Sequence, residues 1–177
     1  KHAGPVRKAL AVRTIFNVLG PLTNPAGARR QLMGVFDNAL VEPIAQVLAA
    51  LGSERAMVVH AEDGLDEIST AAPTRIADLA DGRLEMKTVR PEDFGMPTGK
   101  LADLAVASPA ESAERVRGVL AGRMGSDRDI VVLNAAAALA VSGNADDIPA
   151  GVRLAEQSID EGNAAAALET LVRVSNS

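Results

Sequence analysis

The sequence contains no cysteine, no tryptophan and no tyrosine. Without cysteine, both a disulfide framework and a thiolate metal or catalytic site are excluded. Aromatic residues make up only 2% of the chain, so its core must be built from aliphatic side chains, with alanine prominent among them. Small side chains bury less apolar area each, and the stability of such a core therefore depends on many close contacts.

The chain also lacks an excess of positive charge and a long apolar run. Its net charge is −5, unlike the basic surface of a nucleic-acid-binding protein, so we expect no nucleic-acid partner. No apolar stretch approaches the roughly 20 residues of a membrane-spanning helix, and no signal-peptide pattern opens the chain. We therefore expect no membrane partner, and the absence of cysteine fits a cytoplasmic protein.

The length and composition are typical of one globular domain. The 177 residues are 47% apolar and 23% charged, which is enough to bury a sizeable core. The chain does not begin with methionine, and residues 1–5 read as the interior of a longer sequence. We therefore expect a fragment.

The first half of the chain predicts a strand, a helix and a second strand. Residues 31–36 (QLMGVF) form a short apolar run, in which Gly34 permits the close approach of a neighbouring segment. Apolar residues then recur at helical spacing over 40–51 and stop at Gly52, a typical helix end. Residues 55–60 (RAMVVH) form the next apolar run. This order predicts a right-handed parallel βαβ unit.

The second half predicts a hairpin followed by helices. The Asp81-Gly82 dipeptide separates two half-apolar runs and is typical of a hairpin turn. Residues 90–100 read as a loop. Four helices are then predicted, one starting at Ser108-Pro109 and three over 129–141, 148–161 and 163–174. The expected fold class is α/β, with a mixed, mainly parallel sheet flanked by helices and Ala-rich helices at the carboxyl end.

The segment RKALAVRTIFNVLGPLTNP, residues 7–25, is apolar and interrupted twice by proline. The pairs Gly20-Pro21 and Asn24-Pro25 predict an irregular backbone there. The apolar residues around them predict that this turn packs against the protein and carries Arg7 with it. On the residues alone, Arg7 is either a surface cation or a ligand for a planar carboxylate, which a guanidinium binds through two parallel hydrogen bonds.

A second segment, AEDGLDEIS at 61–69, follows the second predicted strand, where open α/β sheets bind ligands. Four carboxylates within residues 62–67 are unfavourable unless they are solvated or bind a cation. The adjacent Asp66 and Glu67 suit Mg²⁺, which proteins hold with one or two carboxylates plus waters and substrate phosphates. The alternative is a solvated acidic turn. We interpret His60 as a hydrogen-bonded structural residue, and no catalytic acid, base or nucleophile stands out.

Three runs carry a resemblance to a known family. VRKALAVRTIFNVLGPLTNPA (6–26), VVHxxDGLDEIS (58–69) and RDxVxLNAAAAL (128–139) resemble segments of the anthranilate phosphoribosyltransferase family, although Ala11 stands where glycine is usual. The resemblance spans the chain but only the carboxyl-terminal half of the family. It implies that residues 1–177 are the carboxyl-terminal part of a nucleoside phosphorylase/phosphoribosyltransferase-like domain, without the family's helical N-terminal domain and Gly-rich phosphate loop.

This resemblance implies transfer of the phosphoribosyl group from phosphoribosyl diphosphate to anthranilate in tryptophan biosynthesis. It implies that Asp66 and Glu67 bind the Mg²⁺ that accompanies phosphoribosyl diphosphate, and that Arg7 contacts anthranilate. Gly20 and Pro21 would lie beside the aromatic substrate. The family's homodimer forms through its N-terminal region, so we expect this chain alone to be inactive and not to dimerise in that way.

Two alternatives stay open. The first is a pyrimidine nucleoside phosphorylase-like enzyme of the same fold, against which the combination of LGPLTNP and DGLDE argues. The second is a non-catalytic homologue that serves as a binding or regulatory module. An intact Gly-rich phosphate loop upstream would favour the enzyme, because the phosphates need its backbone N–H groups.

Overall fold

The computed structural model describes residues 16–177, with side chains described from Val18 onward. Its four-stranded sheet has the order β1-β2-β3-β4. The strands are β1 (Arg30–Gly34), β2 (Arg55–Ala61), β3 (Thr74–Ala80) and β4 (Arg83–Val89). Strands β1 and β2 pair in parallel and are joined through the short 3₁₀ helix η1 (Asn38–Leu40) and α3 (Val41–Ala50). The predicted parallel strand–helix–strand unit is thereby confirmed.

The predicted hairpin is confirmed as well. Strands β3 and β4 are antiparallel, and the two residues between them, Asp81 and Gly82, have φ values of 50° and 73°. Two successive residues with positive φ are what a type I′ hairpin turn requires.

The sheet is mixed and flanked by helices, as predicted, but it is less parallel than expected. Among the described residues, β1–β2 is the one parallel pair, whereas β2–β3 and β3–β4 are antiparallel. Parallel pairing requires a crossover connection, usually a helix. The connection from β2 to β3, residues 62–73, contains no helix, so β3 returns antiparallel to β2.

The carboxyl-terminal half is helical from Pro109 onward. Its helices are α4 (Pro109–Leu120), α5 (Ser126–Ser142), α6 (Ile148–Asp160) and α7 (Asn163–Ser175). The predicted start at Ser108 is confirmed, because its side chain accepts a hydrogen bond from the Glu111 amide and caps α4. The segment predicted as a loop, 90–100, contains one 3₁₀ turn, η2 (Pro91–Phe94), and a second follows at η3 (Leu101–Leu104).

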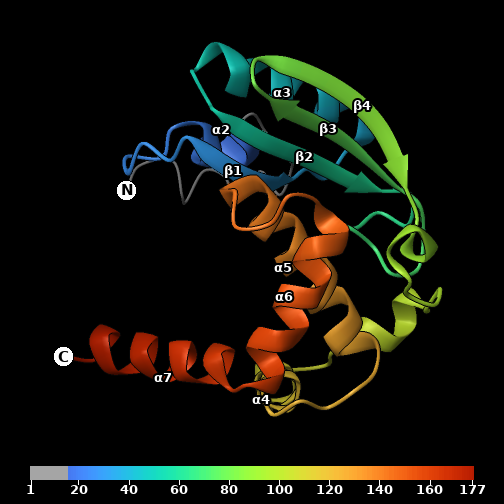
Figure 1. Ribbon diagram of the computed structural model, residues 1–177, viewed down its shortest axis with the longest axis vertical. Coiled ribbons are helices and arrows are strands. Elements are labelled where there is room, and N and C mark those ends of the chain that lie inside the picture. The colour runs from blue at the N-terminus through green and yellow to red at the C-terminus, as the bar shows by residue number, and fades with distance from the viewer. Residues whose placement is uncertain (1–15) are drawn as a thin grey trace, which may run out of the picture.

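Helices cover both faces of the sheet (Figure 1), with α5 and α6 on one face and α3 with α2 (Phe16–Leu22) on the other. Side chains alternate along β2: Met57 and Val59 join the core beneath α5 and α6, whereas Ala56 and Val58 join the core beneath α3. Strand β2 is thus buried on both faces, which explains why its sequence is almost continuously apolar.

Helices α5 and α6 approach each other closely because their contact is built from small residues. Ala136 of α5 is fully buried, and a Cβ atom placed on Gly151 of α6 would lie 2.4 Å from its carbonyl oxygen. Near the other end of α6, Arg128 of α5 donates hydrogen bonds of 2.8 and 3.0 Å to the two carboxylate oxygens of Asp160. Arg128 is only 4% exposed, so this ion pair satisfies a buried cation.

The irregular backbone predicted at Gly20-Pro21 is wrong, because both residues lie within α2. Val18 and Leu22 of this short helix pack against the core beneath α3. Their burial favours the helix, whereas proline by itself disfavours one. Pro21 removes a single N–H donor, and the helix ends one residue later. The Asn24-Pro25 pair does form a turn, in which Asn24 Oδ1 accepts a hydrogen bond from the Ala26 amide.

Helix α7 forms where it was predicted, but its apolar face is only partly covered in the described structure: Ala164 packs against the core, whereas the residues nearer the end of the helix are exposed. None of its residues is buried, and Leu171 and Val172 are 64% and 52% exposed. Figure 1 shows α7 projecting from the end of α6, away from the sheet. None of the helices described is long and apolar enough to cross a membrane.

Candidate functional site

The acidic segment lies in the connection from β2 to β3, directly after the carboxyl end of β2. It opens with a tight turn, in which the Gly64 amide donates to the Ala61 carbonyl and the Ala61 amide donates to the Leu65 carbonyl. Gly64 has a φ of 94°, which a residue with a side chain rarely adopts. We refer to residues 62–73 as the acidic loop.

Asp63 holds the acidic loop in shape. One of its carboxylate oxygens accepts a hydrogen bond from the Leu65 amide at 3.3 Å, and the other accepts the Ser69 hydroxyl at 2.6 Å. The Ser69 oxygen in turn accepts the Ala71 amide at 2.9 Å. Both oxygens of Asp63 therefore accept hydrogen bonds from within the loop itself.

Asp66 and Glu67 are exposed. Neither side chain has a hydrogen-bond or ion-pair partner in the described part of the chain, whereas the main chain between the two residues and directly after them is fixed. The Asp66 carbonyl lies against Gly34 at the end of β1, and the amide and carbonyl of Ile68 bond to the side chain of Asn134 on α5. The loop thus presents two adjacent carboxylates to solvent from an anchored backbone.

This donor set fits Mg²⁺ only in part. In residues 18–177, no group of three or more His, Asp or Glu side chains is placed to hold a metal ion. Mg²⁺ commonly takes one or two carboxylates and completes its six ligands with waters and substrate phosphates. Asp66 and Glu67 supply the carboxylates of such a site, and the remaining ligands would have to come from outside this pair.

Glu67 also lines a cleft of about 330 Å³ between the acidic loop, α4 and α5. Arg115 lies in the same cleft, but its terminal nitrogens donate to Glu111, Asp127 and the carbonyls of Asp103 and Ala105. The hydrogen bond from the Ala107 amide and the one from Arg115 hold the pKa of Glu111 below its usual range. Arg115 is therefore engaged in structure and is not a free cation for a phosphate.

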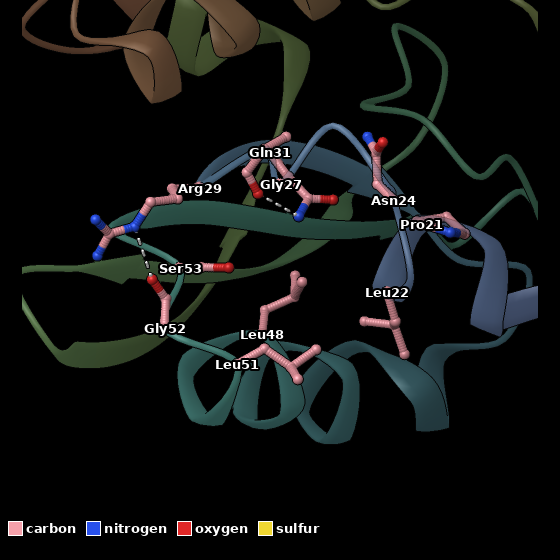
Figure 2. A pocket seen from close by; sticks show the side chains of 11 residues that line it. Pro21, Leu22, Asn24, Gly27, Arg29, Gln31, Leu48, Leu51, Gly52 and Ser53 are labelled. Atoms are coloured by element: carbon pink, nitrogen blue, oxygen red, sulfur yellow. Dashed lines mark hydrogen bonds between the residues drawn. The ribbon is translucent and has the colours of Figure 1, made fainter.

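The predicted substrate turn lies at a different cleft, shown in Figure 2. Its volume is about 190 Å³, and the segment from α2 to β1 and the turn from α3 to β2 line it. Pro21 and Leu22 lie at one side of it, and Arg29 lies at the other, donating to the Gly52 carbonyl at 3.4 Å. Gly20 and Pro21 are exposed. Arg7 lies outside the described residues.

The structure does not bring the predicted substrate turn and the predicted metal pair into one cleft. The cleft of Figure 2 lies where β1 and β2 begin, whereas the acidic loop follows the carboxyl end of β2 and contacts the carboxyl end of β1. Within the described residues, Pro21 and Glu67 line separate clefts. The roles of these residues therefore remain predictions.

Two further polar residues near the acidic loop have clear structural roles. His60 is half-buried, and its Nδ1 lies 2.8 Å from the Val35 carbonyl oxygen, which confirms the prediction of a hydrogen-bonded structural histidine. Asn134 was not predicted as important to the loop. The available signal was an amide within an otherwise apolar helix, because a polar side chain on such a surface requires hydrogen-bond partners.

Comparison with known proteins identifies the family. The model of the glycosyl transferase family, a/b domain, matches residues 1–165. The chain belongs to this family. Among its curated members, the anthranilate phosphoribosyltransferase of Thioalkalivibrio sulfidiphilus is 53% identical over 172 residues, which are 97% of this chain and 51% of that protein. The corresponding protein of Methanobrevibacter smithii is 49% identical over 177 residues, 100% of this chain and 53% of that protein.

Solved structures of this glycosyl transferase family share the fold. Anthranilate phosphoribosyltransferase from Thermus thermophilus superposes with a TM-score of 0.88 at 38% identity, over 97% of this chain and 51% of that one. The Saccharomyces cerevisiae enzyme in complex with PRPP and Mg gives a TM-score of 0.84 at 31% identity, over 95% and 49%. The chain thus spans about half the length of the relatives it matches. The predicted family resemblance and α/β fold class are confirmed.

Proposed function

We propose that this chain is part of an anthranilate phosphoribosyltransferase, which joins anthranilate to the phosphoribosyl group of phosphoribosyl diphosphate (PRPP) and releases diphosphate. The observation that carries the proposal is the identity of about half over nearly the whole chain to relatives that bear this name. One solved relative is in complex with PRPP and Mg, and another structure of it holds 4-fluoroanthranilate. That relative therefore binds both PRPP and an analogue of anthranilate.

In this proposal Asp66 and Glu67 hold Mg²⁺. The support is that both carboxylates are exposed and unpaired among the described residues, while the backbone that carries them is anchored at Asp66 and at Ile68. Mg²⁺, when bound there with PRPP, would neutralise negative charge on the departing diphosphate. Asp63 and Ser69 keep the loop in its shape through the hydrogen bond between their side chains.

The residues proposed to bind anthranilate, which accepts the phosphoribosyl group, are assigned from the sequence alone. Arg7 would bind the carboxylate of anthranilate through two parallel hydrogen bonds, and Gly20 with Pro21 would lie beside its ring. No residue of this chain is assigned as a general base, so we expect the rate to come from orientation and electrostatics. The proposal includes a cytoplasmic homodimer for the whole protein, for which the support is the family resemblance and the cysteine-free sequence.

The test uses the intrinsic fluorescence of anthranilate, to which this chain adds no tryptophan or tyrosine background. The chain is joined to the amino-terminal half of the T. sulfidiphilus relative, and loss of anthranilate fluorescence is followed with PRPP and Mg²⁺. Asp66→Asn and Glu67→Gln should each lower kcat/KM by at least about 100-fold. Glu62→Gln, an exposed carboxylate of the same loop, is the matched control and should change it little.

Arg7→Ala should raise the KM for anthranilate about 10-fold or more and leave the KM for PRPP nearly unchanged, because the lost group is a carboxylate ligand. Full activity of Asp66→Asn would show that the metal is held elsewhere. Turnover of thymidine with phosphate would instead favour a nucleoside phosphorylase, and inactivity of the fused protein with all these substrates would favour the non-catalytic homologue.

A further inference from the structure

One side chain of α5 bonds to the acidic loop through a pair of hydrogen bonds. Asn134 Oδ1 accepts the Ile68 amide at 2.9 Å, and Asn134 Nδ2 donates to the Ile68 carbonyl at 2.9 Å. The same Nδ2 also donates to the Ile130 carbonyl, one turn earlier in α5, at 3.0 Å. A single side-chain amide thus pairs with both main-chain polar groups of the residue that follows Glu67.

Only a side-chain amide at residue 134 can make all three of these hydrogen bonds. An aspartate would accept from the Ile68 amide but would place an anion against the Ile68 and Ile130 carbonyls, and a leucine would make none of these bonds. Ile68 is 1% exposed, so water does not readily replace Asn134 at its peptide groups. Leaving a buried peptide group unpaired is costly, and the backbone at Ile68 is therefore fixed to α5.

A second contact fixes the backbone within the carboxylate pair, at the peptide group that joins Asp66 to Glu67. A Cβ atom placed on Gly34 would lie 1.6 Å from the Asp66 carbonyl oxygen and 2.6 Å from its carbon. A carbon and an oxygen normally approach to about 3.3 Å, so any side chain at residue 34 forces the loop to move. Gly34 is the last residue of β1 and lies opposite Val59 of β2, so the sheet itself determines where Asp66 sits.

We propose that Gly34 and Asn134 are positioning residues for the Asp66–Glu67 metal pair. This inference rests on the proposed Mg²⁺-binding role of that pair. Mg²⁺ demands a nearly octahedral arrangement of oxygens at about 2.0–2.1 Å, so a small displacement of the loop weakens binding although both carboxylates are retained. Supporting residues of this kind typically change metal affinity about 10–100-fold.

The experiment follows metal binding directly, without an activity assay. Mn²⁺ is titrated into the ¹⁵N-labelled chain in the presence of inorganic diphosphate, and broadening of the amide signals of residues 64–68 is recorded by NMR. The wild-type chain should show broadening centred on these residues, and Mg²⁺ should reverse it. Asn134→Ala and Gly34→Ala should each require about 10–100-fold more Mn²⁺ for the same broadening.

Two further variants make the result specific. Asp66→Asn combined with Glu67→Gln should abolish the localised broadening, because it removes both ligands. Val141→Ala truncates a buried residue near the other end of α5, so it lowers stability without touching the acidic loop. It should keep the wild-type Mn²⁺ dependence, and this separates positioning from a general loss of stability.

Each outcome decides between the claims. Wild-type Mn²⁺ binding by Asn134→Ala and Gly34→Ala, with loss of binding in the double carboxylate variant, would overturn the positioning role and keep the metal pair. Localised broadening that survives in the double variant, or that is missing from the wild-type chain, would overturn the metal assignment itself. If Asn134→Ala does not fold, Gly34→Ala tests the positioning role on its own, since that substitution removes no hydrogen bond.

Discussion

The contact between α5 and α6 predicts that Gly151→Ala lowers the stability of the protein. A Cβ atom on Gly151 would lie 2.4 Å from the Ala136 oxygen and 2.9 Å from the Ala136 carbonyl carbon and Cα. These are main-chain atoms of a fully buried helical residue, so no side chain can rotate away. To reach a normal carbon–oxygen contact of about 3.3 Å, Gly151→Ala must separate the helices by roughly 0.9 Å.

Two opposing effects determine the magnitude. Alanine favours the helix over glycine by up to about 1 kcal/mol, whereas overpacking a well-packed core costs about 1–3 kcal/mol. Separation also weakens dispersion contacts between the small residues of the two helices. We expect Gly151→Ala to lower the free energy of unfolding by about 1–2 kcal/mol, which corresponds to a Tm lower by about 2–8 °C for a chain of this size.

The assay is urea and thermal unfolding followed by circular dichroism at about 222 nm, since the chain has no tryptophan. The matched control is Gly118→Ala within α4, where the nearest atoms to an added Cβ belong to the exposed side chain of Arg123. That side chain can rotate, so this variant should be as stable as the wild type or more stable. Equal or higher stability of Gly151→Ala would refute the close approach of α5 and α6.

Two other predictions concern pH and the hairpin. The hydrogen bonds from Arg128 lower the pKa of Asp160 in the folded chain. The ion pair therefore stabilises the folded chain fully above the unfolded-state pKa of Asp160, about 4. This stabilisation is lost as the pH falls through the lower folded-state pKa. The urea midpoint of the wild type should exceed that of Asp160→Asn at pH 7, with a difference that shrinks below about pH 4; a constant difference would contradict this. Gly82→Val should lower the free energy of unfolding by about 1–3 kcal/mol, because Gly82 has a φ of 73°. Asp81→Gly, at the neighbouring positive φ, is its control and should be no less stable; an unaffected Gly82→Val would rule out the type I′ turn.

Local signals in the sequence were sufficient for much of the fold. The apolar run of β2, the helix end at Gly52 and the Asp81-Gly82 turn each depend on neighbouring residues alone, and all three are confirmed. Gly34 was predicted to allow a close approach, and the structure identifies the partner as the Asp66 backbone. A glycine within a strand indicates that another segment comes close to it, but it does not identify that segment.

The remaining features depend on contacts between distant segments. Helix α2 forms despite Pro21 because Val18 and Leu22 pack on the core beneath α3, a gain that no local preference reveals. The apolar face of α7 was visible in the sequence, but its exposure was not. The bond between Asn134 and Ile68 joins residues 66 positions apart, and the sequence alone does not pair them.

That separation has a consequence for how the protein is made. The acidic loop is synthesised well before the helix that anchors it, and at about 5–20 residues per second the 66 residues from 69 to 134 take roughly 3–13 s to synthesise. During that time the loop is shaped only by contacts within the earlier part of the chain, such as those of Gly34, Asp63 and Ser69. The hydrogen bonds between Asn134 and Ile68 can therefore form only after the residues of all four described strands have been synthesised.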